Sequence, residues 1–95
     1  MTTRATATVY PYFGTPPARN PRPAASEPAL VGKRLILSMP EGFIEDVRAV
    51  SERYVDEHNR DVVDVATEED FFAWMLAGKV PLSEAWSTHL VWIQA

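Results

Sequence analysis

The stretch FIEDVRAVSERYVDEH, residues 43–58, carries the clearest periodic pattern in the chain. Its apolar residues recur at intervals of three and four, which places side chains on one face of an α-helix. Charged residues fill the opposite face, as on an amphipathic surface helix. The pattern therefore predicts a helix over 43–58 that ends at Asn59 in a left-handed conformation. The apolar stripe consists of Phe43, Val47, Val50, Tyr54 and His58.

Short β-prone segments lie on both sides of this predicted helix. Residues 33–38 alternate between two faces, and residues 61–66 contain three valines, so each predicts a strand. Residues 88–94 have apolar side chains on both faces, which is typical of a covered strand. Residues 6–10 form a further short β-prone segment.

A second helix is predicted after Thr67, with a body over 71–77 in which nearly every residue is apolar. Thr67 suits its N-cap, and three carboxylates follow in the first turn, where the positive end of the helix dipole favours them. Gly78 suits its C-terminal end. Residues 81–86 are expected to add one helical turn.

The order of these elements predicts an α/β or α+β fold, a small two-layer structure of three to four strands and two helices. An extended, proline-rich N-terminal arm precedes it. Periodicity within each element assigns a core. Its predicted members are Leu35, Leu37, Phe43, Val47, Val50, Tyr54, Val63, Phe72, Met75, Leu76, Leu90 and Trp92.

Charge and proline content divide the chain. Residues 1–40 hold five basic residues and one acidic residue, whereas residues 41–95 hold four basic and twelve acidic residues. Six of the eight prolines precede residue 29. We therefore predict an extended basic arm, residues 1–28, and a small acidic α/β body, residues 29–95. A body of that size buries only about 60% of its unfolded surface, so the arm or a partner is expected to complete it.

Several functional classes have no support in the sequence. The chain has no cysteine, no secretory signal and no apolar run near the ~20 residues of a membrane helix. We expect it in the cytoplasm, or in a virion or assembly formed there. The acidic pI of about 5.0 argues against nucleic acid as a partner.

No motif for catalysis or ligand binding stands out. The two histidines, His58 and His89, have no orienting partner at a suitable spacing. The acidic residues between 61 and 70 lack the pattern of a calcium loop, and the four glycines are isolated, so no phosphate-binding loop exists. The sequence predicts no enzyme, no catalytic or metal-binding residue, no cofactor and no small-molecule substrate.

The predicted partner-binding residues lie mainly in the arm. Aromatic side chains bury large areas at low entropic cost, so three of them in a small, polar segment indicate an anchor. Arginines after them would contact an acidic surface, and a tryptophan on a loop or short turn would form an exposed interface anchor. The residues are Tyr10, Tyr12, Phe13, Arg19, Arg22 and Trp86.

These features predict a non-enzymatic protein-interaction or assembly subunit that docks through its N-terminal arm, as a component of a phage or another multiprotein complex. Its partner would be another protein or further copies of the chain. Two alternatives stay open. One is a small regulator or inhibitor that blocks a basic site of a target through its acidic face. The other is a small enzyme or ligand-binding domain with its site at a homodimer interface.

Overall fold

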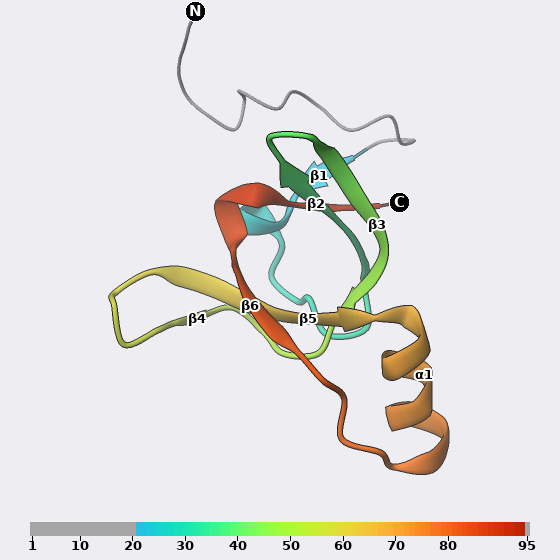
Figure 1. Cartoon of the computed structure of the whole chain (residues 1–95). Coiled ribbons are helices and arrows are strands. Elements are labelled where there is room, and N and C mark those ends of the chain that lie inside the picture. Colours follow the sequence, from blue (N-terminus) through green and yellow to red (C-terminus); the bar gives the residue numbers. More distant parts are fainter. Residues whose placement is uncertain (1–20, 95) are drawn as a thin grey trace, which may run out of the picture.

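The computed structural model describes residues 21–94, which form one curled antiparallel sheet, about half of a barrel, and a single α-helix (Figure 1). Strands account for 43% of these residues and helical turns for 22%. The predicted two-layer α/β or α+β fold with two helices is therefore wrong. The difference arises mainly in residues 43–58, which form strands and a turn.

The elements follow one another along the chain in short units. They are β1 (Arg22–Pro23), the 3-10 helix η1 (Ala24–Ser26), β2 (Arg34–Met39), β3 (Gly42–Ala49), β4 (Tyr54–Val55), β5 (Asp61–Thr67), α1 (Glu68–Ala77), β6 (Glu84–Ser87), the 3-10 helix η2 (Thr88–Leu90) and β7 (Val91–Ile93).

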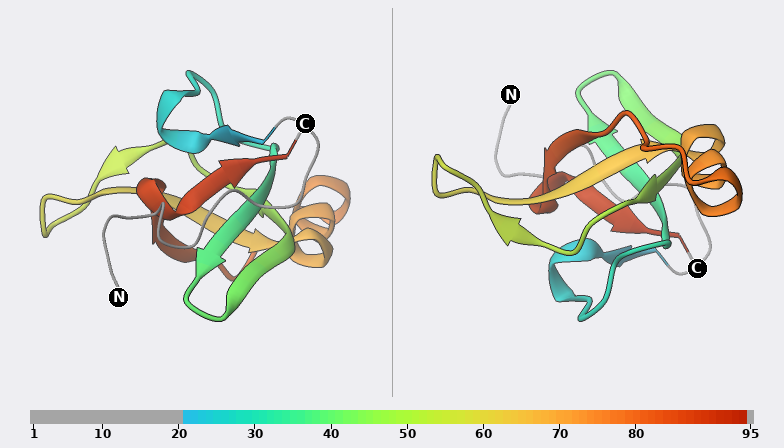
Figure 2. Two further views of the ribbon diagram at one scale, coloured as in Figure 1. Left: turned by 90° about the horizontal axis from the view of Figure 1, so that it is seen from above. Right: turned by 90° about the horizontal axis from the view of Figure 1, so that it is seen from below.

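The strands pair in the order β1-β7-β2-β3-β5-β4, and β6 pairs with β5. Val62 in β5 pairs with Tyr54 of β4 and with Ser87 of β6, so these two strands lie on opposite sides of β5. The short η2 then carries the chain from β6 into β7, across the sheet. Figure 2 shows the resulting curl, with α1 at one side of the sheet.

A β-bulge in β3 explains why the sequence of this strand has apolar residues at helical spacing. Leu35 of β2 pairs with Val47 and Leu37 pairs with Ile44, so β3 has one residue more than β2 between the two pairs. An extra residue of this kind shifts the alternation of side chains. Ile44 and Val47, three residues apart, consequently line the same groove. Asp46 within the bulge has a φ of 63°, a left-handed conformation that Asp tolerates better than most residues.

A second interruption follows at residues 50–53, where β3 ends in a bend. There the Ser51 hydroxyl accepts a hydrogen bond from the Asp64 backbone N–H, and the Val50 N–H donates to the Asp64 carbonyl. The four-residue spacing between Val50 and Tyr54 therefore reflects a break between strands. Asn59 is left-handed as predicted, with a φ of 62°, but it lies in the β4–β5 turn and ends no helix.

The core lies inside the curl of the sheet and combines residues from most strands with two from the N-terminal part. Its members are Ala24, Leu30, Leu35, Leu37, Val47, Ala49, Val63, Val65, Val91 and Ile93. The predicted core residues Leu35, Leu37, Val47 and Val63 are buried, whereas Phe43, Val50, Leu90 and Trp92 are half-buried. Four predictions are wrong, because Tyr54, Phe72, Met75 and Leu76 are exposed.

Part of the segment assigned to the arm packs on the sheet. Arg22 and Pro23 pair with β7, and Ala24 is fully buried in the core. The Arg53 side chain donates a hydrogen bond to the Ala25 carbonyl. The remaining arm residues, 1–20, lie outside the described residues, so the division between arm and body at residue 28 stays a prediction.

Of the other predicted elements, two strands are confirmed, one is confirmed in part and one helical turn is wrong. The strands predicted over 33–38 and 61–66 match β2 and β5 closely. The segment 88–94 begins as η2 and becomes β7 only at Val91. The helical turn predicted for 81–86 is wrong, since β6 begins at Glu84.

Candidate functional site on helix α1 and the segment that follows it

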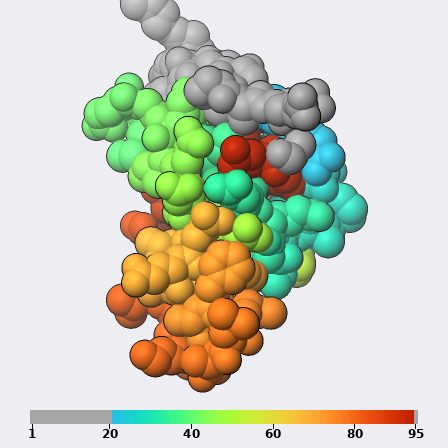
Figure 3. Space-filling model, turned by 90° about the vertical axis from the view of Figure 1, so that its right-hand side faces the viewer, coloured from blue at the N-terminus to red at the C-terminus, as the bar shows by residue number. Residues whose placement is uncertain are grey.

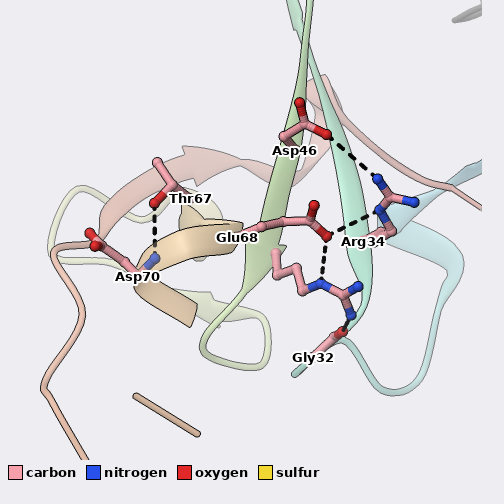
Figure 4. Close-up of polar contacts among 7 residues, drawn as sticks. Gly32, Arg34, Asp46, Thr67, Glu68 and Asp70 are labelled. Carbon is pink, nitrogen blue, oxygen red and sulfur yellow. Dashed lines mark hydrogen bonds and ion pairs between the residues drawn. The ribbon is translucent and has the colours of Figure 1, made fainter. Parts of the chain in front are cut away.

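Helix α1 begins and ends at the residues that the sequence indicates. The Thr67 hydroxyl accepts a hydrogen bond from the Asp70 backbone N–H at 3.1 Å and so caps the first turn (Figure 4). Carboxylates at the next three positions suit the positive end of the helix dipole. Gly78 ends the helix with a φ of 70°, and its N–H donates to the Trp74 carbonyl at 2.9 Å.

A cluster of charged side chains holds the start of α1 against the sheet (Figure 4). Arg48 Nε lies 2.8 Å from Glu68 Oε2, and Arg34 Nε lies 3.2 Å from the same oxygen. Arg48 also donates to the Gly32 carbonyl at 2.8 Å, and Arg34 pairs with Asp46 of the β3 bulge at 3.5 Å. We call these four charged residues the Arg48–Glu68 cluster.

Aromatic side chains complete the attachment of the helix. The Arg48 guanidinium lies over the rings of Phe71 and Phe72, at 5.4 and 5.0 Å from their centroids. Phe71 makes edge-to-face contacts with Phe72 and Trp74 and is only 6% exposed. It is the single buried residue of α1. The side of the helix that carries Phe71 is therefore held against the sheet, whereas Phe72, Met75 and Leu76 are exposed to solvent.

Among the described residues, five of the nine exposed large apolar side chains lie on α1 and on the segment between α1 and β6. They are between 43% and 89% exposed. Figure 3 shows this part of the chain, in orange, forming the lower end of the molecule. We call the five residues the α1 apolar face. They are Phe72, Met75, Leu76, Val80 and Leu82.

An apolar groove with a volume of about 320 Å³ adjoins this face. Residues of β2, β3 and β5 line it together with the segment that enters β6. Leu82 belongs to both the groove and the α1 apolar face. Because a cavity of about 150 Å³ holds one benzene molecule, the groove has room for roughly two aromatic rings. The lining residues are Leu37, Ile44, Val47, Val65, Ala66, Thr67, Leu82, Ser83, Glu84 and Trp86.

The ionisable residues around the groove and the helix are mostly acidic. Glu84 lines the groove, and Glu69 and Asp70 stand in the first turn of α1. Glu68 already pairs with two arginines, and Lys79 follows the helix. The surroundings of the apolar surface therefore favour a positively charged ligand segment.

The predicted partner-binding residues fall in different places. Tyr10, Tyr12, Phe13 and Arg19 lie outside the described residues. Arg22 is exposed in β1 and pairs with Glu27 at 3.4 Å. In the strand order, β7, β2 and β3 separate β1 from β5, the strand that leads into α1. Trp86 is a half-buried residue of strand β6, where it packs on the core and lines the groove.

The two histidines and the acidic residues serve separate local contacts. His58 is exposed in the β4–β5 turn, and its backbone N–H donates to Asp56 Oδ1 at 2.9 Å. A hydrogen bond from the Arg60 backbone N–H to Asp56 lowers the pKa of that carboxyl below 3.8. His89 lies in η2. Within residues 21–94, no group of three or more His, Asp or Glu side chains could hold a metal ion.

The Asp64 carboxylate accepts a hydrogen bond from the Tyr54 hydroxyl at 2.6 Å. This bond stabilises the protonated phenol and raises the pKa of Tyr54 above 10.0. Asp61 lies 3.9 Å from Arg53. The acidic run of the sequence is thus divided between the β4–β5 hairpin and α1.

The α1 apolar face was not among the sites that the sequence indicated, although a signal existed. Residues 71–77 are apolar on nearly every side, and two further aliphatic residues follow at 80 and 82. A helix of this composition needs cover all round. Within residues 21–94, Phe71 is the single buried residue of α1, and Phe72, Met75 and Leu76 are exposed.

Comparison of the chain with protein-family models, with curated proteins and with solved structures finds no match to any of them. Among the helices in residues 21–94, none has the length and apolar character to cross a membrane.

Proposed function

We propose that this chain is a non-enzymatic protein-interaction or assembly subunit, and that the α1 apolar face is a docking surface. The observation that supports this proposal is the exposure of five large apolar side chains within residues 72–82. Contiguous exposed apolar surface on a small protein commonly marks an interface. Single exposed apolar residues elsewhere need no such explanation.

The energy of docking follows from the size of these side chains. Burying one Leu, Met or Phe side chain contributes about 1.5–3 kcal/mol. Covering three or four of them gives on the order of 5–10 kcal/mol, against an association cost of roughly 4–15 kcal/mol. The α1 apolar face alone is therefore marginal. A stable complex also needs the adjoining groove and the acidic residues around it.

The firm attachment of α1 to the sheet favours docking through the α1 apolar face. The Thr67 cap, the Gly78 end and the Arg48–Glu68 cluster fix the helix before any partner binds. A surface that is already ordered loses little conformational entropy on binding. The exposed side chains of Phe72, Met75 and Leu76 thus lie on a helix that is already fixed to the sheet.

The N-terminal arm forms the second part of the proposal. Its aromatic residues Tyr10, Tyr12 and Phe13 and its arginines suit a groove with acidic surroundings. The chain would then act in a phage particle or another multiprotein complex, with one surface and one extended segment available for contacts.

A comparison of the wild type with two surface variants tests the docking surface. The tagged full chain, the double variant Leu76→Glu/Leu82→Glu and the control Val55→Glu would be expressed in the source cell and captured. Val55 is a suitable control because it is 63% exposed in β4, outside α1 and the groove. Partners would be quantified by mass spectrometry and rebound in purified form.

We expect one stoichiometric partner with the wild type and with Val55→Glu, and its loss with Leu76→Glu/Leu82→Glu. Because Leu76 and Leu82 are 85% and 84% exposed, the charged substitutions should leave the fold intact, which circular dichroism would check. Retention of every partner by the double variant would contradict the proposed surface.

A further inference from the structure

We propose that the apolar groove and the α1 apolar face receive residues 9–13, Val-Tyr-Pro-Tyr-Phe, from the arm of a neighbouring copy of this chain. The inference rests on the proposed function, because it names the partner of the same surface. It makes the chain both donor and acceptor in a head-to-tail assembly.

The first argument is the match in size and chemistry. The groove has a volume of about 320 Å³, and aliphatic side chains form most of its lining. That volume suits roughly two aromatic rings. Residues 9–13 contain three aromatic residues, and outside this segment residues 1–20 contain none. Two rings would fill the groove, and the third would cover the exposed side chains of Leu76 or Leu82.

The second argument is charge. Residues 1–20 hold Arg4 and Arg19 and no acidic residue. Glu84 lines the groove, and Glu69 and Asp70 begin α1. An arm with its aromatic residues in the groove would have an arginine on either side of them. Complementary charges of this kind fix the orientation of a bound segment and speed its association.

The third argument is the free edge of β6. Among the described strands, β6 pairs only with β5, so its other edge is available for an added strand. Residues 6–10 are β-prone and precede Pro11, so their backbone N–H groups can donate to that edge. Backbone pairing beside the groove would set the register in which the aromatic side chains enter it.

The fourth argument concerns which copy provides the arm. The described chain starts at β1, which β7, β2 and β3 separate in the strand order from β5, the partner of β6. Pro16, Pro17 and Pro21 lie between the aromatic residues and β1, and proline-rich segments are stiff, extending about 3.1 Å per residue. Such a segment is poorly suited to doubling back across its own sheet. It is well suited to reaching a neighbour.

A contact of this kind is heterologous, because the donor and acceptor surfaces differ. A linear assembly keeps one free arm at one end and one free groove at the other. The state of association should therefore depend on concentration and on salt, since screening weakens the contacts of the arginines.

The test uses purified full chains and sedimentation velocity over a wide range of concentration. The donor variant carries Tyr10→Ser, Tyr12→Ser and Phe13→Ser. The acceptor variant carries Leu76→Glu and Leu82→Glu. The matched control is Val55→Glu. Loss of central aromatic or aliphatic contacts should weaken self-association by at least about tenfold.

We expect the wild type and the control to self-associate and each variant alone to be monomeric. An equimolar mixture of the two variants should form a one-to-one heterodimer, because one provides the only intact groove and the other the only intact arm. A dimer in which two α1 apolar faces meet directly, without the arm, would not give this complementation.

Three results would overturn the inference. Self-association of the donor variant at wild-type strength would show that the surfaces meet without the arm. A monomeric wild type at every concentration would exclude assembly between copies. If the donor variant binds a peptide of residues 6–16 more tightly than the wild type does, at concentrations where the wild type is monomeric, the groove belongs to the chain's own arm. In each case the proposed function survives if the acceptor variant still loses a native partner, so the two failures are distinguishable.

Discussion

Arg48 in β3 and Glu68 at the start of α1 form an ion pair with 2.8 Å between Arg48 Nε and Glu68 Oε2. Both side chains are only 23% exposed, so water screens the pair less than it screens a surface pair. The same guanidinium lies over Phe71 and Phe72 and bonds the Gly32 carbonyl. Arg48 therefore couples the loop before β2, the sheet and the helix that carries the candidate docking surface.

Removing the charge of Glu68 should loosen this attachment. Glu68→Gln is expected to lower the free energy of unfolding by about 1–2 kcal/mol, the scale of a hydrogen bond to a charged group. A double-mutant cycle with Arg48→Met should give a coupling energy near 1 kcal/mol in urea unfolding. Glu69→Gln, at an exposed neighbouring position, is the control and should change stability by less than about 0.5 kcal/mol. Additive effects of Arg48→Met and Glu68→Gln would contradict the coupling.

Removing the Thr67 cap should also lower the free energy of unfolding, independently of the Arg48–Glu68 pair. Thr67→Ala removes the acceptor for the Asp70 N–H and should cost about 1 kcal/mol. Thr67→Ser keeps a hydroxyl at the same position and should stay within a few tenths of a kcal/mol of the wild type. Thermal and urea unfolding would measure both. Equal destabilisation by Ala and Ser would indicate that the methyl group matters and the cap does not.

Truncation to alanine should lower the free energy of unfolding far more at a core leucine than at a surface leucine. Leu35 is fully buried, so Leu35→Ala should cost about 2–5 kcal/mol through the lost transfer energy and the cavity left behind. Leu76 is 85% exposed, so Leu76→Ala should change the stability of the isolated chain by less than about 0.5 kcal/mol. Chemical denaturation of both variants gives the comparison. A large loss for Leu76→Ala at low protein concentration would mean that the side chain is covered within one chain.

The β3 bulge can be tested at Asp46. Its φ of 63° is costly for a β-branched residue, so Asp46→Val should destabilise the chain by about 1–2 kcal/mol. Asp46→Gly adopts this conformation freely and should be tolerated better, although it loses the ion pair with Arg34. Unfolding curves would rank the two variants. A valine variant as stable as the glycine variant would place the bulge elsewhere.

Asp56 should make the stability of the folded chain depend on pH in the acidic range. Its pKa in the folded chain is lowered, first by the hydrogen bond from the Arg60 backbone N–H and then by the Arg60 side chain and the His58 N–H. A lowered pKa means that its stabilisation is complete above about pH 4, the usual pKa of Asp, and is lost as pH falls through the folded value. Asp56→Asn should therefore lose less stability than the wild type between about pH 5 and about pH 2. Urea midpoints across this interval would show the difference, and parallel curves would refute it.

The candidate surface could be predicted only in part. The apolar run at 71–77 and the aliphatic residues after it are visible in the sequence, yet periodicity assigned Phe72, Met75 and Leu76 to the core. Periodicity reports which side chains share a face and is silent on whether another element covers that face. Phe71 is the single buried residue of α1, and Phe72, Met75 and Leu76 stay exposed.

The groove could not be predicted from the sequence either, because its lining residues lie far apart along the chain. Leu37, Ile44 and Val65 come from three strands, and Leu82 comes from the segment before β6. Their proximity depends on the register of β2 with β3 and on the pairing of β6 with β5. No spacing along the chain encodes these long-range pairings.

By itself, the sequence determined the local signals. Thr67 and Gly78 set the two ends of α1, and the alternation at 33–38 and the valines at 61–66 marked β2 and β5. These signals act over a few residues, through capping hydrogen bonds, left-handed backbone and side-chain alternation. Only the tertiary structure decided the state of residues 43–58. A bulge at Asp46 and a bend after Ala49 produced spacings of three and four in a chain that pairs as strands. The hydrogen bonds that β3 makes with β2 and β5 outweigh the weak helical preference of this segment, because they connect it to the buried core.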